Sequence, residues 1–148
     1  MYLEKRLKDK FLILGSDGMA GHMLYYFLKM QENFELFTLS RKQHKTNDHH
    51  LLLDLKNLDA LEQYIAKVQP KYLVNCAGIL VKDSEENVES AIFINAYLPH
   101  FLAGLSLKYG FKLIHISTDC VFNGKRGQYI ETDLPDELNL YGKTKALG

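Results

Sequence analysis

Two side chains near the end of the sequence, Tyr141 and Lys145, have the types and the spacing of an acid–base pair. Residues four apart lie on the same face of a helix, so the phenol and the amine would be neighbours. An isolated phenol has a pKa of about 10, and a nearby ammonium group favours its ionised form. The pair could therefore move a proton near neutral pH. The same spacing also arises by chance on helix surfaces, so other motifs must show whether the pair is catalytic.

A second candidate is the glycine-spaced segment GSDGMAG, which overlaps the end of the apolar run FLILG. Three glycines that leave a strand and open a helix are typical of a turn that binds a dinucleotide. Gly15 would allow the tight turn, Gly18 the close approach of a pyrophosphate, and Gly21 the packing of helix on strand. The N–H groups at the helix start would face the phosphates, so Asp17 and Met19 join the three glycines as predicted cofactor contacts. A plain glycine-rich turn is the alternative.

The end of the next predicted strand carries Ser40 and Arg41, at the position where a dinucleotide fold selects between NAD and NADP. A carboxylate there would bind the ribose 2′-hydroxyl, whereas arginine can hold a 2′-phosphate and serine can hydrogen-bond it. NADP(H) is therefore the predicted cofactor. NAD(H) is the alternative, because Arg41 and Lys42 could also belong to a solvated loop. Asp54, followed by Leu55, could accept a hydrogen bond from the adenine amino group.

Short apolar runs alternate with segments of helical period along the sequence. The strands and helices that they predict would position these residues. Near-continuous apolar runs are typical of strands covered on both faces, which indicates a parallel sheet. Right-handed crossovers then give an α/β fold of the doubly wound, or Rossmann, type. Pro70 and Gly110 would end two of the helices, and Pro99 predicts a bend or a close contact within the longest one. The predicted strands are 11–15, 34–40, 51–55, 71–78 and 112–118; the predicted helices are 19–28, 58–68, 91–109 and one from 141, with a loop at 41–50 and an acidic loop and helix start at 81–88.

The composition narrows the classes of partner. The chain has 148 residues, of which 47% are hydrophobic, enough for one compact domain. Lys+Arg and Asp+Glu both number 18, so the net charge is zero, which argues against nucleic acid or an anionic membrane as a partner. No apolar run reaches the length of a membrane span, about 20 residues. The N-terminal residues also lack a signal-peptide pattern, so a cytoplasmic protein is expected.

The cysteines and histidines show no pattern of a metal site. Cys76 and Cys120 stand in unrelated contexts, which favours free thiols over a disulfide or a zinc site. His49 and His50 fall at a predicted loop and strand start and are expected to be solvated, and His115 alternates within an apolar strand as a core histidine with satisfied hydrogen bonds would. We therefore predict no metal.

Four motifs follow one another in the order GSDGMAG, NCAG at 75–78, STDCVFNG at 117–124 and YGKTK at 141–145. In this order and on these predicted elements, the sequence resembles the extended short-chain dehydrogenase/reductases, and most closely the dTDP-4-dehydrorhamnose reductases. The glycine spacing G-x-x-G-x-x-G fits the extended type, and the segment 117–145 carries the more specific part of the resemblance. The resemblance extends from Phe11 to the last residue.

The resemblance implies a role for each residue of the four motifs. Tyr141 would protonate a sugar ketone, Lys145 would support it and hold the nicotinamide ribose, and Thr118 would orient the carbonyl oxygen. Cys76, Ala77 and Gly78 would lie along the ribose and nicotinamide of the cofactor, and Ser117 would touch the nicotinamide. Asn95 is also a candidate at the cofactor site, where it would bond to strand backbone.

The implied activity is the NADPH-dependent reduction of a nucleotide-linked 4-keto-6-deoxy sugar, in polysaccharide-sugar biosynthesis. The family usually has a tyrosine where this chain has Cys120, and a threonine near Ile79 and Leu80, so the identity of the sugar is open. A 4,6-dehydratase would need an Asp–Glu pair after the threonine, whereas Asp119 is followed by cysteine. An NAD-dependent nucleotide-sugar epimerase and a non-catalytic NADP-binding regulatory subunit are the alternatives.

Members of the resembled family are longer than this chain. We expect 1–148 to be an incomplete Rossmann domain, cut within the helix that begins near Tyr141, and a C-terminal sugar-binding domain to be absent from it. That helix often packs against a partner subunit in the family, so a homodimer is expected for the full-length protein. The 148 residues alone should bind dinucleotide weakly and show no sugar turnover.

Overall fold

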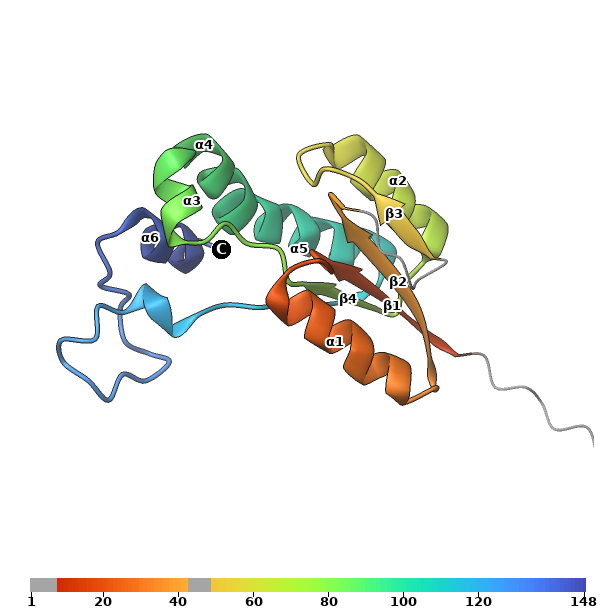
Figure 1. Cartoon of the computed structure of the whole chain (residues 1–148), viewed down its shortest axis with the longest axis horizontal. Coiled ribbons are helices and arrows are strands. Elements are labelled where there is room, and N and C mark those ends of the chain that lie inside the picture. Colours follow the sequence, from red (N-terminus) through yellow and green to blue (C-terminus); the bar gives the residue numbers. More distant parts are fainter. Residues whose placement is uncertain (1–7, 43–48) are drawn as a thin grey trace, which may run out of the picture.

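The computed structural model describes residues 8–42 and 49–148, and its centre is one parallel sheet of five strands in the order β3-β2-β1-β4-β5 (Figure 1). Every neighbouring pair of strands is parallel, as the near-continuous apolar runs predicted. The order reverses beside β1, the first strand, which lies between β2 and β4. The strands are β1 (Asp9–Leu14), β2 (Phe34–Ser40), β3 (His50–Leu52), β4 (Tyr72–Asn75) and β5 (Lys112–His115).

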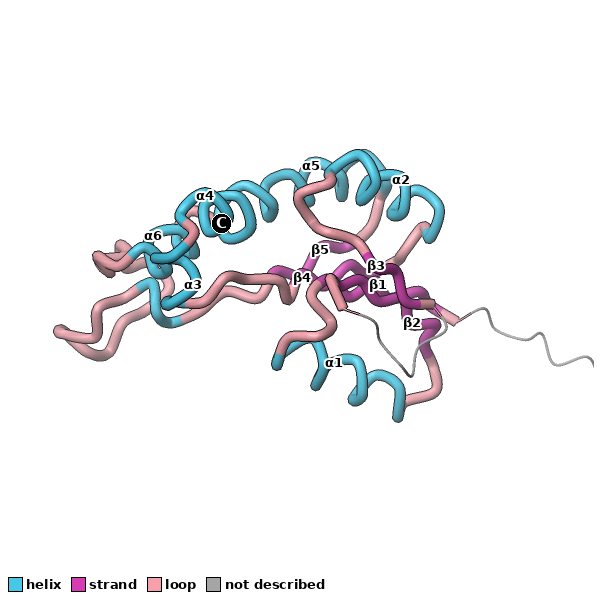
Figure 2. The backbone as a smooth tube through the Cα atoms, turned by 45° about the horizontal axis from the view of Figure 1, so that its top comes forward, coloured by secondary structure: helices cyan, strands magenta, loops and turns pink. Residues whose placement is uncertain are grey.

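Helices cover the two faces of the sheet unequally, with α1 on one face and α2 and α5 on the other (Figure 2). Alternation along β1 explains the two layers, because Leu12 and Leu14 join the core under α2 and α5 while Ile13 packs with Tyr25 and Leu28 of α1. The helices are α1 (Met19–Met30), α2 (Leu58–Val68), α3 (Val81–Glu86), α4 (Val88–Ala91), a π-helix (Ile92–Tyr97), α5 (Leu98–Tyr109), a 3₁₀ turn (Asp119–Val121) and α6 (Leu140–Ala146).

The helix ends follow the local sequence. Asn57 caps α2 by accepting a hydrogen bond from the Ala60 N–H, and Gln69 leaves that helix in a left-handed conformation just before Pro70. Gly110 ends α5 with φ of 75°, as its position predicted. Pro99 lies inside the continuous helical stretch Val88–Tyr109, directly after the π-helix, where the helix geometry changes.

Four predicted segments, three strands and the acidic segment, differ clearly from those of the structure. The strands predicted at 51–55, 71–78 and 112–118 end at Leu52, Asn75 and His115, so each is shorter at its carboxyl end. The cause at β4 is visible, because the Asn75 side chain turns back and accepts a hydrogen bond from the Ala77 N–H. The acidic segment at 81–88 is more helical than predicted, since α3 occupies most of it. Within the predicted loop at 41–50, residues 43–48 lie outside the described residues.

One continuous helical stretch, Val88–Tyr109, is long and apolar enough to cross a membrane by length and composition alone. The sequence analysis did not identify it, because no single apolar run within it is long. Half of its most apolar window is buried, and Leu98, Leu102 and Leu105 belong to the main core. Its apolar character is therefore explained by its position as the central helix on one face of the sheet.

Candidate functional site

The carboxyl ends of the strands bring the predicted motifs to one edge of the sheet. Leu14 pairs with Leu39 on one side and with Asn75 on the other, and Asn75 pairs with His115. Residues that follow these positions therefore leave the sheet side by side. Ligands of open parallel sheets bind at this edge, at the point where the strand order reverses.

The glycine turn has the conformation that its spacing predicted. Gly15 adopts φ of +73°, and a Cβ there would lie 2.9 Å from the Ala77 backbone. A Cβ on Gly21 would overlap the Gly15 carbonyl oxygen, so this glycine lets α1 pack on the turn. A Cβ on Gly18 would meet only the Gly15 oxygen, at 3.4 Å, so the space beside Gly18 is open. The turn thus presents bare backbone at the start of α1.

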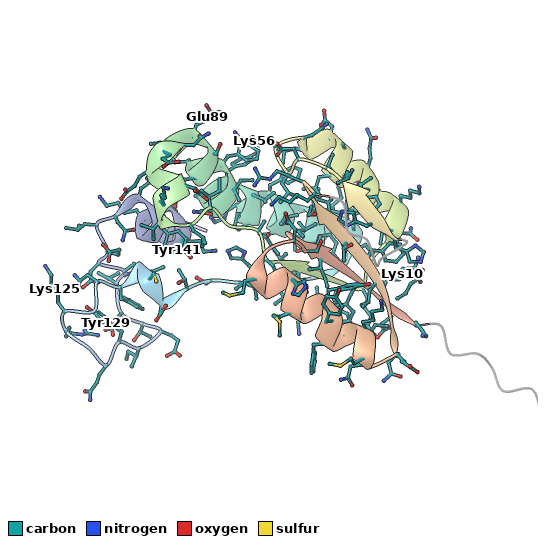
Figure 3. The ribbon with its side chains drawn as sticks, viewed as in Figure 1. Lys10, Lys56, Glu89, Lys125, Tyr129 and Tyr141 are labelled. Atoms are coloured by element: carbon teal, nitrogen blue, oxygen red, sulfur yellow. The ribbon has the colours of Figure 1, made fainter. Side chains whose placement is uncertain are left out.

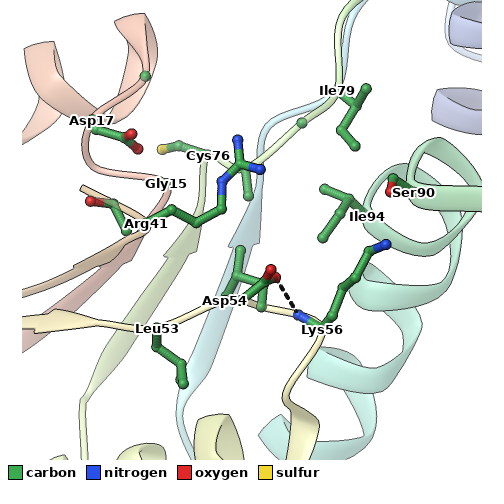
Figure 4. A pocket seen from close by; sticks show the side chains of 15 residues that line it. Gly15, Asp17, Arg41, Leu53, Asp54, Lys56, Cys76, Ile79, Ser90 and Ile94 are labelled. Carbon is green, nitrogen blue, oxygen red and sulfur yellow. Dashed lines mark hydrogen bonds between the residues drawn. The ribbon is translucent and has the colours of Figure 1, made fainter. Parts of the chain in front are cut away.

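A cavity of about 300 Å³ opens at this edge, between the glycine turn, the ends of β2, β3 and β4, and the start of the long helix (Figure 4). Its size and mixed lining are those of a small-molecule site. Ten predicted cofactor residues line it, namely Gly15, Asp17, Gly18, Ser40, Arg41, Asp54, Leu55, Cys76, Ala77 and Gly78.

Charged side chains stand on opposite sides of the cavity. Arg41 reaches across it from the end of β2, and Lys56 rises beside Ile94 and Ser90 of the long helix (Figure 4). Asp54 lies between them, with one oxygen accepting a hydrogen bond from the Lys56 N–H at 3.0 Å. The Ser40 hydroxyl donates to the Lys42 carbonyl, so it also holds the turn that carries Arg41.

The Cys76 thiol lies in the wall of this cavity. Burial raises its pKa to about 11. Because the thiolate is the nucleophilic form, this cysteine is inert at neutral pH. Cys120 is exposed, and both cysteines are free, as predicted.

Five residues of the cavity wall were missed by the sequence analysis. Leu53 and Lys56 flank the predicted pair Asp54 and Leu55, so the rule that ligands bind after parallel strands could have found them. The other three follow β4 or lie on the long helix, where an apolar pattern does not say which face meets a cavity. They are Ile79, Ser90 and Ile94.

The predicted acid–base pair lies beside the cavity, on α6, and does not line it. Asn139 caps α6 by accepting a hydrogen bond from the Gly142 N–H at 2.8 Å. Tyr141 is half-buried in the first turn, and Lys145 is only 5% exposed. The Lys145 amine donates to the Ile116 carbonyl at 2.8 Å, which ties α6 to the chain just after β5.

Thr118 lies three residues beyond the end of β5, whereas the sequence placed it at the end of the strand. Its hydroxyl accepts the Cys120 N–H at 3.2 Å and so caps the 3₁₀ turn. The same turn packs against α6. Thr118 therefore belongs to the neighbourhood of α6, and Ser117, which precedes it, is exposed outside the cavity lining.

Asn95 connects the cavity to α6. It is fully buried, its oxygen accepts the Ile79 N–H at 2.8 Å, and its nitrogen donates to the Ile79 carbonyl at 2.9 Å. The same nitrogen donates to the Thr144 hydroxyl at 3.1 Å. The side chain thus bonds to backbone near the site, in the loop after β4, and it does not line the cavity. Met19, 87% exposed, and Gly21 also lie outside the lining.

The environment of Lys145 is unusual for a lysine. Its amine also lies 3.3 Å from Nε2 of His115, whose Nδ1 lies 3.1 Å from the Asn75 amide nitrogen. Burial lowers the pKa of Lys145 from its ordinary value. Burial, with the Lys145 charge as a second cause, lowers the pKa of His115 to about 4. His115 is therefore neutral at pH 7, and both of its ring nitrogens lie beside polar groups, as the prediction of a histidine with satisfied hydrogen bonds required.

The sequence matches a known protein family over nearly its whole length. The family described as RmlD substrate binding domain matches residues 9–148. The chain belongs to this family. A dTDP-4-dehydrorhamnose reductase of Aggregatibacter actinomycetemcomitans is 32% identical over 141 residues, which cover 94% of this chain and 45% of that protein. The resemblance inferred from the four motifs is confirmed.

Two further relatives extend the comparison. The crystal structure of the Bacillus anthracis dTDP-4-dehydrorhamnose reductase, in complex with NADP, is similar with a TM-score of 0.81 and 30% identity, over 95% of this chain and 48% of that one. The beta subunit of methionine adenosyltransferase 2 from Danio rerio is 34% identical over 139 residues, which cover 93% of this chain and 41% of that protein. The chain thus spans about half the length of the relatives it matches.

Metal binding has no support in the described parts of the chain. Within residues 8–42 and 49–148, no group of three or more histidine, cysteine, aspartate or glutamate side chains could hold an ion.

Proposed function

We propose that the chain is the cofactor-binding part of an NADPH-dependent reductase that acts on a nucleotide-linked 4-keto-6-deoxy sugar, like the dTDP-4-dehydrorhamnose reductases of its family. One observation carries the proposal. A bare glycine turn and a cavity with a cation lie at the same sheet edge as a helix that bears Tyr141 and Lys145. Cofactor and acid would therefore meet at the carboxyl ends of β4 and β5.

The cavity fits a dinucleotide phosphate. Gly15 and Gly18 leave backbone without side chains at the start of α1, where N–H groups can hold a pyrophosphate. Arg41, which crosses the cavity, would hold the 2′-phosphate of NADP, and Asp54 would accept a hydrogen bond from adenine. Lys56 adds a second cation to the same space. NADP in the Bacillus anthracis relative agrees with this assignment.

The residues of α6 and the 3₁₀ turn would carry the acid chemistry. The bound cofactor would supply a hydride, which the side chains of the protein cannot. Tyr141 would give its proton to the ketone oxygen, and Lys145, one helical turn away, would stabilise the phenolate that remains. The Thr118 hydroxyl, which donates to the Asp119 carboxylate at 3.4 Å, would instead donate to the ketone oxygen and orient it, while still accepting the Cys120 N–H.

The sugar-binding part is proposed to lie outside these 148 residues, since the relatives are about twice as long. Cys120 and Ile79 stand where sugar contacts are expected in the family, so the sugar could differ from that of the rhamnose pathway. A cytoplasmic homodimer in polysaccharide-sugar biosynthesis remains the expected setting.

Oxidation of NADPH with dTDP-4-keto-6-deoxy sugars by the full-length protein tests the proposal. We expect turnover in the native protein, loss of most of it in Tyr141→Phe with cofactor affinity retained, and no change in Tyr109→Phe. Tyr109 is the matched control because it lies at the C-terminal end of α5, outside the cavity lining, where its hydroxyl donates to Glu62 of α2. Equal turnover in Tyr141→Phe and the native protein would remove Tyr141 from the acid role.

A regulatory subunit is the second candidate, and the similarity to the methionine adenosyltransferase 2 beta subunit favours it. Such a protein would bind NADP without turning over a sugar. Tight NADPH binding together with no turnover of any 4-keto-6-deoxy nucleotide sugar would support this reading and overturn the reductase proposal.

A further inference from the structure

The turn that carries Arg41 is held by side chains from two neighbouring strands. Thr38 and Ser40 lie two residues apart on β2, so their side chains point to the same face of the sheet as Ile13, the face that α1 covers. His50, the first residue of β3, pairs with Thr38 in the register of the sheet. Three polar side chains therefore meet on one face, directly before Arg41 leaves the strand.

The hydrogen bonds of these side chains converge on the Lys42 carbonyl. The Ser40 hydroxyl donates to this oxygen at 2.8 Å and accepts the Lys42 N–H at 3.3 Å. Nε2 of His50 lies 2.8 Å from the same oxygen, and Nδ1 of the ring lies 2.8 Å from the Thr38 hydroxyl. Thr38 is fully buried and Ser40 is 3% exposed, so the two side chains that anchor the turn on β2 are shielded from water.

The carbonyl determines which nitrogen of His50 carries a proton. A carbonyl oxygen can only accept, so Nε2 must be an N–H donor. When the ring is neutral, Nδ1 accepts from the Thr38 hydroxyl, and when the ring is charged, the hydroxyl accepts from Nδ1 instead. The bond from Nε2 to the Lys42 carbonyl is the same in both states, so it does not depend on the charge of the ring.

The direction of the Arg41 side chain depends on this turn. The side chain reaches into the cavity, and among the described residues no hydrogen bond or ion pair holds it (Figure 4). Its direction is therefore set by the backbone, and Lys42, the next residue, has both its N–H and its carbonyl bonded. A cation on a fixed backbone loses less conformational freedom when it binds a phosphate. We propose that His50, oriented by Thr38, is a positioning residue that fixes the turn of Arg41 and so increases the preference for NADPH over NADH.

The inference rests on the proposed function, in which Arg41 binds the 2′-phosphate of NADP. His50 does not line the cavity, so it acts through Arg41 and not on the dinucleotide. NADH lacks the 2′-phosphate, and its affinity should therefore not depend on His50. The sequence analysis expected a solvated histidine at this position, whereas the ring is partly buried and both of its nitrogens are bonded.

Calorimetric titration of the full-length protein with NADPH and with NADH tests the inference. His50→Leu keeps much of the bulk of the ring and removes both nitrogens, so NADPH affinity should fall about fivefold while NADH affinity stays unchanged. In His50→Gln the side-chain amide can still donate to the Lys42 carbonyl, so most of the native preference should be retained. A merely structural role predicts the same loss for both dinucleotides. Such an equal loss, or a native preference for NADPH in His50→Leu, would overturn the proposal.

A double variant tests whether His50 acts through Arg41. In Arg41→Ser the guanidinium is already absent, so the further change His50→Leu should alter neither affinity. An additive loss of NADPH affinity in the double variant would overturn the proposal. His49→Leu is the matched control, because the ring of His49 lies against Phe37 and outside the cavity lining, and the preference for NADPH should stay native.

A further variant covers the case in which His50→Leu does not fold. Thr38→Val keeps the shape of the buried side chain and removes the hydroxyl that orients the ring, so the preference for NADPH should fall about threefold. If His50→Leu does not fold, an unchanged preference in Thr38→Val overturns the proposal.

The titrations require no sugar turnover, so they separate this inference from the proposed function. Equal affinity of the native protein for NADPH and NADH would overturn the assignment of Arg41 to the 2′-phosphate, and this inference with it. A native preference for NADPH that survives in His50→Leu would overturn this inference alone.

Discussion

The two halves of the sheet edge are built in different ways. The cavity side, around Gly15 and Arg41, consists of bare backbone and of charged side chains that reach into open space (Figure 4). The α6 side consists of buried polar side chains that bond one another, with Asn95 and Lys145 almost inaccessible. Figure 3 shows the separation between Lys56, which lines the cavity, and Tyr141 on α6.

This difference indicates which residues stabilise the fold and which are available to bind a ligand. Within residues 8–42 and 49–148 no hydrogen bond or ion pair holds the Arg41 side chain, so its loss should change binding and leave stability intact. On the α6 side the same atoms hold the elements together and place the candidate acid. Substitutions there should change stability and chemistry together.

The largest loss of stability is expected at Gly21, where α1 packs directly on the backbone of the glycine turn. In Gly21→Ala, the new methyl group would overlap the Gly15 carbonyl, so either α1 or the glycine turn must move. We expect a loss of about 3 kcal/mol in the free energy of unfolding, measured by urea denaturation. Gly104→Ala is the matched control, because nothing lies within 4 Å of the added methyl and alanine favours the helix. Equal stability of the two variants would mean that Gly21 is not needed for packing.

The α6 side should respond almost as strongly to loss of one amide. Asn95→Ala leaves the part-buried N–H and carbonyl of Ile79 and the buried Thr144 hydroxyl without this partner. We expect a loss of about 2–3 kcal/mol, since each abandoned buried group costs on the order of 1 kcal/mol or more. Asn57→Ala, at the exposed cap of α2, should cost about 1 kcal/mol. A cost at Asn95 no greater than that at Asn57 would contradict the contrast between the two sides.

Substitution of Arg41 should affect dinucleotide binding and leave the stability of the fold unchanged. Arg41→Ser should weaken NADPH binding about tenfold, which is about 1.4 kcal/mol, and leave NADH binding and unfolding nearly unchanged. Lys42→Ser is the control, since Lys42 is the exposed neighbour of Arg41 and does not line the cavity. Calorimetric titration of each variant with both dinucleotides measures the difference. A parallel loss of NADPH and NADH affinity would separate Arg41 from the 2′-phosphate.

The smallest predicted effect is a pH dependence on the α6 side. The pKa of His115 falls from 6.5 to about 4 on folding, so the unfolded chain binds a proton there that the folded chain does not. The free energy of unfolding should therefore decrease as the pH falls from 6.5 toward 4. Urea denaturation across this range should show a smaller decrease in His115→Gln than in His22→Gln. The same decrease in both would remove His115 from this dependence.

The sequence predicted most of the cavity side and less of the α6 side. Gly15, Arg41 and Asp54 could be placed because carboxyl ends of parallel strands meet at one edge, whatever packs around them. Ile94 was missed because a helical pattern does not mark the face that meets a cavity, whereas Lys56, in the loop after β3, could have been found from the rule for parallel strands. Alternation along the strand predicted a core histidine with satisfied hydrogen bonds at 115, but it could not identify Lys145, on a distant helix, as the neighbour of the ring.

A crystal structure of the protein with NADP⁺ tests the central claim most directly, namely that both sides of this sheet edge serve one dinucleotide. The account predicts the pyrophosphate at the start of α1, the 2′-phosphate beside Arg41 and the nicotinamide ribose beside Lys145. A dinucleotide bound elsewhere, or one whose nicotinamide ribose lies away from Lys145, would contradict the claim that the cavity and α6 form one active site.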